Sequence, residues 1–436
     1  MLQQSSDHTS ARSGHHVFDW VRQFLLAIIT GAISGGVIAL FRYLVFMGVV
    51  RRQQVWAGIA TEAGSFVWVF ILMAALAALG GIVTRALPVT TGSGVTRVFL
   101  ALAGEEQLHW WPSLLAKFLA SWGILVSGLS LGREGPAVFM GAATGQAVGS
   151  WLKADQAQKR QLLAYGTAAA VAAAFGAPLA GVLFVWEEFK YSSLQSFFVP
   201  AVGAVVAATK VSAHFLGPQT QLLLTPSPDL PNRAIVIFLL LGLFLGLLGL
   251  VYHRSLSYAR RLFALVGGHL VWFRPVLAVI PVAVLALLFG SDLLGSGHQL
   301  VSRALSGSDG VGVAAVLLMS KLLLTVVCAA SDASGGVFVP LLSVGALTGS
   351  VFGQIASGFF PSLAFSPRFV VAGMAAAFGG ILRLPFTGLI LVFELTGSYN
   401  YENLLYYLAA ALVAYLVRER GEKFLAKKQL EAASET

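Results

Sequence analysis

The chain has 436 residues, of which 57% are hydrophobic and only 11% are charged. A soluble domain carries about 25% charged residues to cover its surface, so this composition excludes a water-soluble protein and predicts a polytopic membrane protein. The net charge of +9 does not indicate nucleic-acid binding, because the basic residues lie between apolar runs, as they do in cytoplasmic loops.

The usual markers of an enzyme are missing from the sequence. Cys328 is the only cysteine, which excludes a disulfide framework and a multi-cysteine metal site. Neither H-E-x-x-H nor G-x-S-x-G occurs, so zinc and serine hydrolase chemistry lack their motifs. We therefore expect no enzymatic activity, and the sequence implies no cofactor and no metal.

The first membrane segment is predicted in the apolar run Phe24–Val50, which only Arg42 interrupts. This run is longer than the apolar core of a signal peptide, so residues 1–22 are expected to form a polar cytoplasmic tail. The basic residues of 418–436 predict a second cytoplasmic tail. With ~20 residues per span, roughly ten to fifteen segments fit. Apolar stretches lie near 24–50, 66–86, 114–130, 137–151, 161–175, 178–187, 194–215, 234–265, 271–290, 311–330, 337–357, 369–382, 385–396 and 402–417.

Several of these stretches are too short to cross ~30 Å of hydrocarbon as straight helices. Breaks rich in glycine and proline separate them. Irregular backbone at membrane depth is tolerated only where protein buries it or where it lines a wet cavity. The breaks therefore mark the expected transport path, at 88–94, 132–136, 176–178, 335–340 and 379–385.

The sequence contains an internal repeat. Residues 136–149 read PAVFMGAATGQAVG and residues 340–353 read PLLSVGALTGSVFG, so the proline, three glycines and an Ala-x-Thr core recur 204 residues later. The pentapeptide AAAFG occurs at 172–176 and again at 375–379. Such an ordered repetition predicts a duplicated unit rather than a chance match.

The repeat continues beyond this point. Residues 178–188 read PLAGVLFVWEE and residues 385–395 read PFTGLILVFEL. We expect residues 23–217 and 218–417 to form the two halves of one transport domain, because duplicated units with interrupted helices are typical of secondary transporters. The repeat alone leaves open whether the halves are parallel or inverted.

Three of the breaks are expected to lead directly into helices, at 92–94, 132–136 and 335–340. A helix start leaves unpaired N–H groups and a partial positive charge, and glycines let a ligand approach this backbone closely. Such starts can hold an anion without a full positive charge, so that it can be released again. The alternative is that the glycines only permit close helix packing.

Acidic residues occur at two places in these apolar surroundings. Glu134 lies inside the second break, where an ionisable side chain indicates function; it could mimic the anion as a gate, or simply pair with Arg133. Glu187 and Glu188 are expected to close a helix that starts at Pro178. Glu187 has a counterpart in the repeat, Glu394, whereas Glu188 has none and is the better candidate for a special function.

With these residues the chain resembles the CLC family of chloride channels and chloride/proton antiporters, over about residues 20–425. The family motif GSGxP is similar to Gly92-Ser93-Gly94-Val95, with Thr96 where proline is usual. GREGP matches Gly132–Pro136 without change, and GxFxP matches Gly336–Pro340.

The resemblance implies an all-α bundle of inverted repeats with broken helices, and roles for particular residues. Ser93 with the N–H groups of Val337 and Phe338 would surround the central anion. Gly92 and Ser93 would form an inner site beside Gly94. Glu134 would be the external gate and Glu188 the internal proton acceptor. The outer site would use the N–H groups of Arg133, Glu134, Gly135 and Val339.

The resemblance also implies partners and a location. We expect chloride and protons as the transported ions, and a two-fold homodimer in the membrane, formed by helices around 178–215 and 385–417. No nucleic acid is expected. The absence of cytoplasmic CBS domains favours a multi-pass protein of a bacterial inner membrane, with both termini cytoplasmic.

One departure from the family concerns a tyrosine on its last helix. Spacing from Glu394 puts that position near Leu425, and Tyr415 lies about ten residues too early. The predicted function is chloride/proton exchange, and this departure keeps a passive chloride channel as the alternative. Ser93 disfavours a fluoride exporter, because it keeps the chloride-type motif. A membrane hydrolase or a scaffold would explain neither Glu134 nor the repeat.

Overall fold

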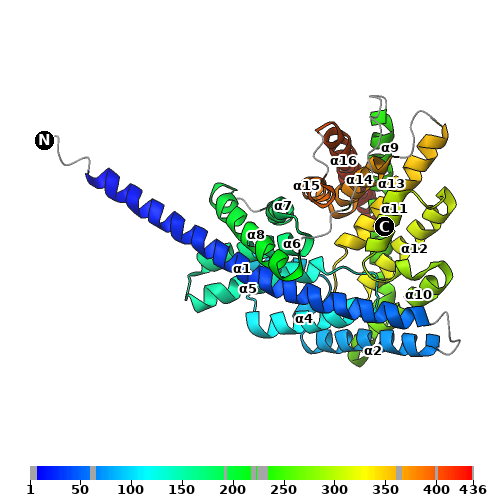
Figure 1. The fold of residues 1–436 in the computed structure, drawn as a ribbon, viewed down its shortest axis with the longest axis horizontal. Helices are drawn as coiled ribbons and strands as arrows, with labels where there is room; N and C mark the ends of the chain where they lie inside the picture. The colour runs from blue at the N-terminus through cyan, green and yellow to red at the C-terminus, as the bar shows by residue number, and fades with distance from the viewer. Residues whose placement is uncertain are drawn as a thin grey trace.

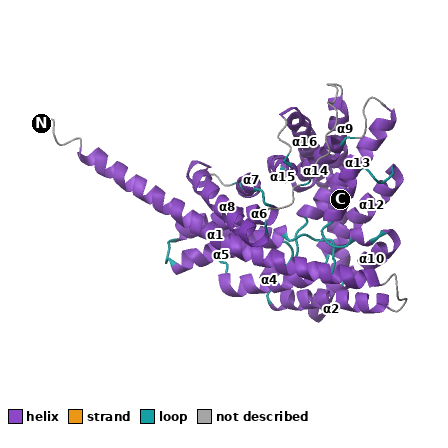
Figure 2. Cartoon of the chain, in the orientation of Figure 1, coloured by secondary structure: helices purple, strands orange, loops and turns teal. Residues whose placement is uncertain are grey.

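The computed structural model describes residues 7–58, 65–190, 194–217, 222, 234–359, 366–397 and 401–434. These residues fold as helices and loops, and among them the single pairing of extended backbone is an isolated bridge (Figure 1, Figure 2). The α-helices are α1 Asp7–Ala57, α2 Ser65–Ala86, α3 Val95–Ala103, α4 Trp110–Val126, α5 Glu134–Trp151, α6 Gln156–Phe175, α7 Pro178–Phe189, α8 Leu194–Leu216, α9 Ile235–Ala264, α10 Arg274–Phe289, α11 His298–Ser306, α12 Val311–Ala330, α13 Phe338–Phe359, α14 Pro367–Ala377, α15 Pro385–Thr396 and α16 Tyr401–Ser434. Short turns of other helix types are η2 Pro88–Thr90, η4 Gly268–Phe273, η5 Ser291–Leu293 and η6 Phe378–Leu382.

The helix lengths confirm the predicted multi-pass membrane protein. Seven helices among the described residues are long and apolar enough to cross a membrane: α1, α2, α8, α9, α10 with the turn before it, α12 and α13. Others, such as α3 with 9 residues and α7 with 12, span only about 14–18 Å at ~1.5 Å per residue. These short helices begin or end inside the protein, as the glycine-rich breaks predicted.

The two terminal helices are longer than the apolar runs that predicted them. α1 begins at Asp7, and its first turns project beyond the other helices (Figure 1). α16 continues to Ser434, so the basic residues from Arg418 onward extend a membrane helix. Within α1, Arg42 donates to the carbonyl of Ala173 at 2.7 Å and to Ser212 Oγ at 3.0 Å. Protein acceptors thus accommodate the charge that interrupts this apolar run.

Helices α1–α8 and α9–α16 repeat one set of contacts. α1 packs on α8 as α9 packs on α16, and α5 packs on α6 as α13 packs on α14. The pairs α2 with α4 and α3 with α5 recur as α10 with α12 and α11 with α13. The duplicated sequence therefore folds as two equivalent eight-helix halves, within the part of the chain that the structure describes.

The halves meet through bonds between equivalent residues. Gly132 N–H donates to the Gly336 carbonyl at 2.7 Å, and Gly336 N–H donates back to Gly132 at 2.8 Å, in antiparallel pairing. Ser121 and Ser334 share a hydrogen bond of 2.9 Å, and their repeat counterparts Thr325 and Ser130 share one of 3.0 Å. Reciprocal contacts of this kind define a two-fold relation, so a two-fold axis relates the two halves.

A second reciprocal contact joins α7 and α15. The Glu394 carboxylate accepts from the N–H groups of Leu179 at 3.0 Å and Ala180 at 2.9 Å, at the start of α7. The Glu187 carboxylate accepts from the first N–H groups of α15 in the same way, at 3.1 and 2.7 Å. A carboxylate is favourable at a helix start, so each half stabilises a broken helix of the other.

The two AAAFG pentapeptides do not occupy equivalent positions in the two halves. Gly166 of α6 lies against Gly141 of α5, and in the second half Gly373 lies against Gly345, so the helices correspond at a spacing of 207 rather than 203 residues. The left-handed Gly176 that ends α6 accordingly corresponds to the left-handed Arg383 (φ 70° and 67°). The second AAAFG therefore lies one helical turn before the structural equivalent of the first.

The reciprocal capping makes a testable prediction about stability. Glu394→Gln removes the negative charge from the start of α7 while keeping the side-chain shape. We expect the free energy of unfolding to fall by about 1–2 kcal/mol, measured as a lower thermal midpoint of the purified protein in detergent. The control is Glu419→Gln, which changes a partly exposed residue paired with Lys423 and away from the start of α7. Equal midpoints for the two variants would contradict the capping role.

Candidate functional site

Three helix starts converge on the centre of the molecule, as the glycine-rich breaks predicted. α3 begins at Val95, α5 at Glu134 and α13 at Phe338. Gly135, on the first turn of α5, lies between the other two starts. A Cβ placed on Gly135 would lie 2.8 Å from Ser93 Cβ and 2.7 Å from Gly336 Cα. Only glycine leaves room for this approach.

Backbone hydrogen bonds hold the three loops in register. Besides the Gly132–Gly336 pair, Gly335 N–H donates to the Gly92 carbonyl at 3.2 Å. Gly92 N–H is directed at the carbonyl of Asp332, at 3.5 Å. These bonds use backbone groups before the helices, so the N–H groups of the first helical turns remain available to a ligand.

The start of α3 presents a hydroxyl and unpaired amides. Gly94, at φ 84°, ends the loop in the left-handed conformation and, as the N-cap residue, has no side chain to cap the helix. Ser93 Oγ accepts from Val95 N–H at 3.3 Å, which leaves the hydroxyl proton to donate elsewhere. Thr96 is exposed on the first turn of α3, so the helix starts as the resemblance implies without the usual proline.

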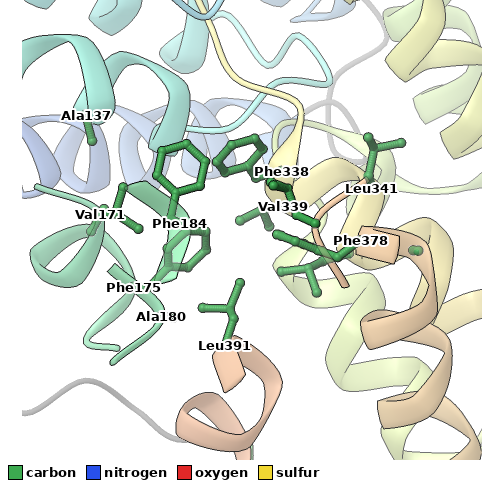
Figure 3. Close-up of a cluster of buried hydrophobic side chains, with 14 of the residues drawn as sticks. Ala137, Val171, Phe175, Ala180, Phe184, Phe338, Val339, Leu341, Phe378 and Leu391 are labelled. Carbon is green, nitrogen blue, oxygen red and sulfur yellow. The ribbon is translucent and has the colours of Figure 1, made fainter. Parts of the chain in front are cut away.

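The start of α13 is enclosed by aromatic side chains. Phe338 lies 5.5 Å from the ring of Phe184 on α7 and 5.8 Å from that of Phe378 in η6. Figure 3 shows these rings meeting beside Val339, where the two halves approach each other. Val337 remains partly exposed, whereas Phe338 and Val339 are buried. The amides of this turn therefore lie at the edge of an apolar layer, where water competes less for an anion.

Glu134, the first residue of α5, is completely buried (0% exposed). Neither of its carboxylate oxygens has a hydrogen-bond partner, and the closest ion-pair contact is Arg133 Nε to Oε1 at 3.6 Å. The local pair with Arg133 therefore forms, but at a distance beyond a normal hydrogen bond. A carboxylate with two unsatisfied oxygens gains donors by moving, so this side chain is suited to change position.

Two buried lysines brace equivalent loops. Lys117 donates to the carbonyls of Thr90 at 2.9 Å and Gly92 at 2.6 Å. Lys321, 204 residues later, donates to the carbonyls of Leu293 at 3.3 Å and Gly295 at 2.5 Å. Both lysines are fully buried. Both ammonium groups therefore satisfy carbonyls of the loops that precede α3 and α11.

Glu188 lies apart from this cluster, near the end of α7. It lines an open cavity of about 710 Å³ together with Lys190, Arg383 and Tyr415. No ion pair joins Lys190 to Glu187 or Glu188 among the described residues. Glu187 lines the same cavity, but the start of α15 binds its carboxylate, so Glu188 is the member of the doublet that this contact leaves available.

The position of the family tyrosine remains without one. α16 passes through Leu425 as an unbroken helix, and Leu425 is partly exposed there. Tyr415, which the spacing rejected, lies instead in the cavity with Glu188. The sequence-based argument thus missed a phenol close to the second glutamate.

The structure also reveals a repeat that sequence reasoning missed. Gly295-Ser296-Gly297 precedes α11 as Gly92-Ser93-Gly94 precedes α3, and both helices have nine residues. The sequence could have indicated this repeat, because the tripeptide is identical in both halves and a lysine follows it at a similar spacing. Among the described residues, no group of His, Cys, Asp or Glu is arranged to hold a metal ion.

Comparison with known proteins places this arrangement in a family. The profile of the family described as voltage gated chloride channel matches residues 73–419. The chain belongs to this family. The match covers all three helix starts and the α7–α15 contact, so the CLC resemblance of the motifs is confirmed at the level of the family.

Relatives of this CLC protein include proteins named as exchangers. The H(+)/Cl(-) exchange transporter ClcA of Vibrio cholerae is 34% identical over 402 residues, covering 86% of this chain and 82% of the relative. The transporter of the same name from Yersinia pseudotuberculosis is 33% identical over 428 residues, covering 94% and 87%.

Solved structures share the fold of this CLC protein. The crystal structure of a slow cyanobacterial Cl-/H+ antiporter superposes with a TM-score of 0.84 at 28% identity, covering 92% of this chain and 94% of the other. A CLC-type fluoride/proton antiporter gives 0.78 at 22% identity, covering 92% and 96%. At that identity the second likeness concerns the fold alone.

The close approach at Gly135 predicts that a single methyl group disrupts the site of this CLC protein. In Gly135→Ala, the new Cβ would collide with Ser93 and Gly336, so the α3 and α13 starts must separate. We expect chloride binding, measured by isothermal titration calorimetry, to weaken at least about tenfold. Gly358→Ala is the control, because a Cβ there meets no atom within 4 Å. Unchanged binding in Gly135→Ala would refute the convergence of the three starts as the anion site.

Proposed function

We propose that this protein exchanges chloride for protons across a membrane, and that it acts as a transporter rather than an enzyme. The observation that carries the proposal is the buried carboxylate of Glu134, which lies without hydrogen bonds where three helix starts meet. An unpaired anion at a site suited to anions is expected of a gate that competes with the transported ion. The names of the ClcA relatives and of the cyanobacterial structure support the same reaction.

Chloride would pass between the helix starts. Ser93 Oγ and the N–H groups of Val337 and Phe338 would hold it at the centre, since a hydroxyl proton and unpaired amides can donate to it. Gly92 and Ser93, next to Gly94, would contact it on one side. On the other side the donors would be the N–H groups of Arg133, Glu134, Gly135 and Val339. None of these contacts is a full positive charge, so the ion can leave again.

Glu134 would alternate between two states. Charged, it can take the place of chloride among the N–H groups at the start of α5. Protonated, it no longer competes for those donors, so it moves away and admits chloride. Each cycle would then carry a proton in one direction and chloride in the other, with Arg133 balancing the charge when the carboxylate is withdrawn.

Glu188 would exchange protons between Glu134 and the aqueous phase at the opposite side. Its place in an open cavity gives access to water. Phe184, one turn earlier on α7, packs on Phe338 at the start of α13, so an apolar layer lies along the route. We expect protons to cross this layer only where water enters it.

The assembly follows from the same resemblance. Residues 23–217 and 218–417 would be the halves of one transport domain, between a tail of residues 1–22 and a basic segment of residues 418–436. Two copies would associate through α7, α8, α15 and α16 into a homodimer with one pathway per subunit. Large apolar side chains exposed on these helices support a buried interface there, among them Leu179, Val199, Phe386 and Leu405. Photobleaching of labelled protein in liposomes tests this, with two steps expected per particle.

The membrane would be the bacterial inner membrane, with both termini in the cytoplasm. The cations near the end of α16 favour that side, and the matched relatives come from bacteria. A fluorescent protein fused to the C-terminus, of a kind that matures only in the cytoplasm, should fluoresce in intact cells.

The gate makes a direct prediction about coupling. In liposomes with an outward chloride gradient, the protein should drive protons uphill while chloride leaves. Glu134→Gln keeps the side-chain shape but cannot bind or release a proton, so uphill proton movement should fall to the level of empty liposomes. A pH electrode and a chloride electrode read the same sample. Chloride efflux without proton movement in the unaltered protein would instead indicate the passive channel.

The second glutamate should affect proton movement alone. Glu188→Gln removes a proton acceptor that touches none of the three helix starts, so chloride flux should continue while proton flux falls about tenfold or more. Glu105→Gln is the control, because Glu105 is exposed next to the end of α3. If chloride and protons remained coupled in Glu188→Gln, this residue would not be the internal acceptor.

A further inference from the structure

The loop before α11 copies the loop before α3 in geometry as well as sequence. Gly297 ends it in the left-handed conformation at φ 91°, as Gly94 does at φ 84°, and each glycine is an N-cap residue without a side chain to cap its helix. Gly295 N–H donates to the Gly128 carbonyl at 2.7 Å, in the place of the Gly92–Asp332 contact. The start of α11 thus offers unpaired amides and the hydroxyl of Ser296.

This second helix start opens into a cavity of about 180 Å³, large enough for several small ions or waters. Ser296, Gly297 and His298 line one wall, and Arg52 of α1 and Arg133 line another. Arg133 also forms the long ion pair with Glu134. The cavity therefore lies directly beside the gate.

Arg52 is the observation that points to an anion in this cavity. It is buried, with 3% of its surface exposed, and no carboxylate of the described residues pairs with it. Its terminal nitrogen donates only to the carbonyls of Leu125 at 3.3 Å and Val126 at 3.2 Å, and its Nε has no partner. A buried guanidinium without a counter-ion is costly, so a mobile anion would stabilise it.

The second half indicates what is missing around Arg52. There Asp332, the repeat counterpart of Gly128, pairs with Arg274. Gly128 has no side chain to offer Arg52, whose terminal nitrogen would lie 3.1 Å from a Cβ at this position. The acid that does line the cavity, Asp292, is already bound to Arg303 at 2.7 Å. The cavity thus keeps a positive charge that no protein group neutralises.

We propose that this cavity is an additional anion site, in which the amides at the start of α11, Ser296 and Arg52 hold a chloride next to Arg133 before it enters or after it leaves the gate. The site is the inverted-repeat counterpart of the loop at Ser93, so each end of the pathway has a Gly-Ser-Gly helix start. This inference rests on the proposed transport function. It adds the start of α11 to the three helix starts that would contact the transported chloride.

Bromide in crystals tests the site directly. Bromide replaces chloride and scatters anomalously, so the unaltered protein should show a peak within hydrogen-bond reach of Ser296 and another near Ser93. The peak near Ser296 should be lost in Arg52→Gln and kept in Arg51→Gln, the control, because Arg51 is exposed on the same turn of α1. A peak near Ser93 alone would overturn this inference and leave the proposed function intact. Absence of both peaks would count against both.

Transport kinetics test whether a bound anion is used. Ser296→Ala and Arg52→Gln should raise the chloride concentration for half-maximal flux, by about tenfold for the charge change, while maximal flux and the thermal midpoint stay close to those of Arg51→Gln. Ser296→Ala removes only a partly exposed hydroxyl, so it keeps the test valid if Arg52→Gln does not fold. A bromide peak combined with unaltered half-maximal concentrations in both variants would mean an adventitious ion only, and would overturn the proposal.

Discussion

The hydrogen-bonded pair of Gly132 and Gly336 is the contact on which the rest of the structure depends. A helix that starts inside a membrane protein exposes N–H groups that lipid cannot satisfy. Pairing the two loops backbone to backbone brings two such starts together, and the third start follows because Gly135 has no side chain to hold Ser93 away. The unpaired amides are then collected at one place, where an anion can satisfy them.

The buried cations around this centre outnumber the buried carboxylates that could neutralise them. Lys117 and Lys321 donate to loop carbonyls and not to carboxylates. Arg133 forms only a long ion pair with Glu134. Arg52 has carbonyl acceptors and no acid. An interior with more fixed cations than anions favours small mobile anions, and Glu134, the one buried carboxylate in the described part of the chain, is in a position to compete with them.

The two acids of the α7 doublet illustrate how adjacent residues acquire different tasks. Glu187 caps α15, as Glu394 caps α7, and this exchange binds the halves together across the two-fold relation. Glu188 has no counterpart and faces a cavity with Tyr415 and Arg383. Symmetry therefore separates the structural glutamate from the one available for proton transfer, because a residue required by the fold recurs in both halves.

The sequence by itself determined the membrane class, the duplication, the three helix starts and the importance of Glu134, because composition and glycine placement act locally. The repeat alone could not determine how the halves are oriented to each other, since this depends on how they pack in three dimensions. It also misled on register: the AAAFG match falls one turn from true equivalence, because three more residues separate Gly345 from Gly373 than separate Gly141 from Gly166, and the alanine-rich sequence of both helices hides this insertion. The second Gly-Ser-Gly tripeptide, before α11, is visible in the sequence. That it forms an anion site was inferred only from the tertiary structure, which places Arg52 beside Gly128, where the other half has Asp332.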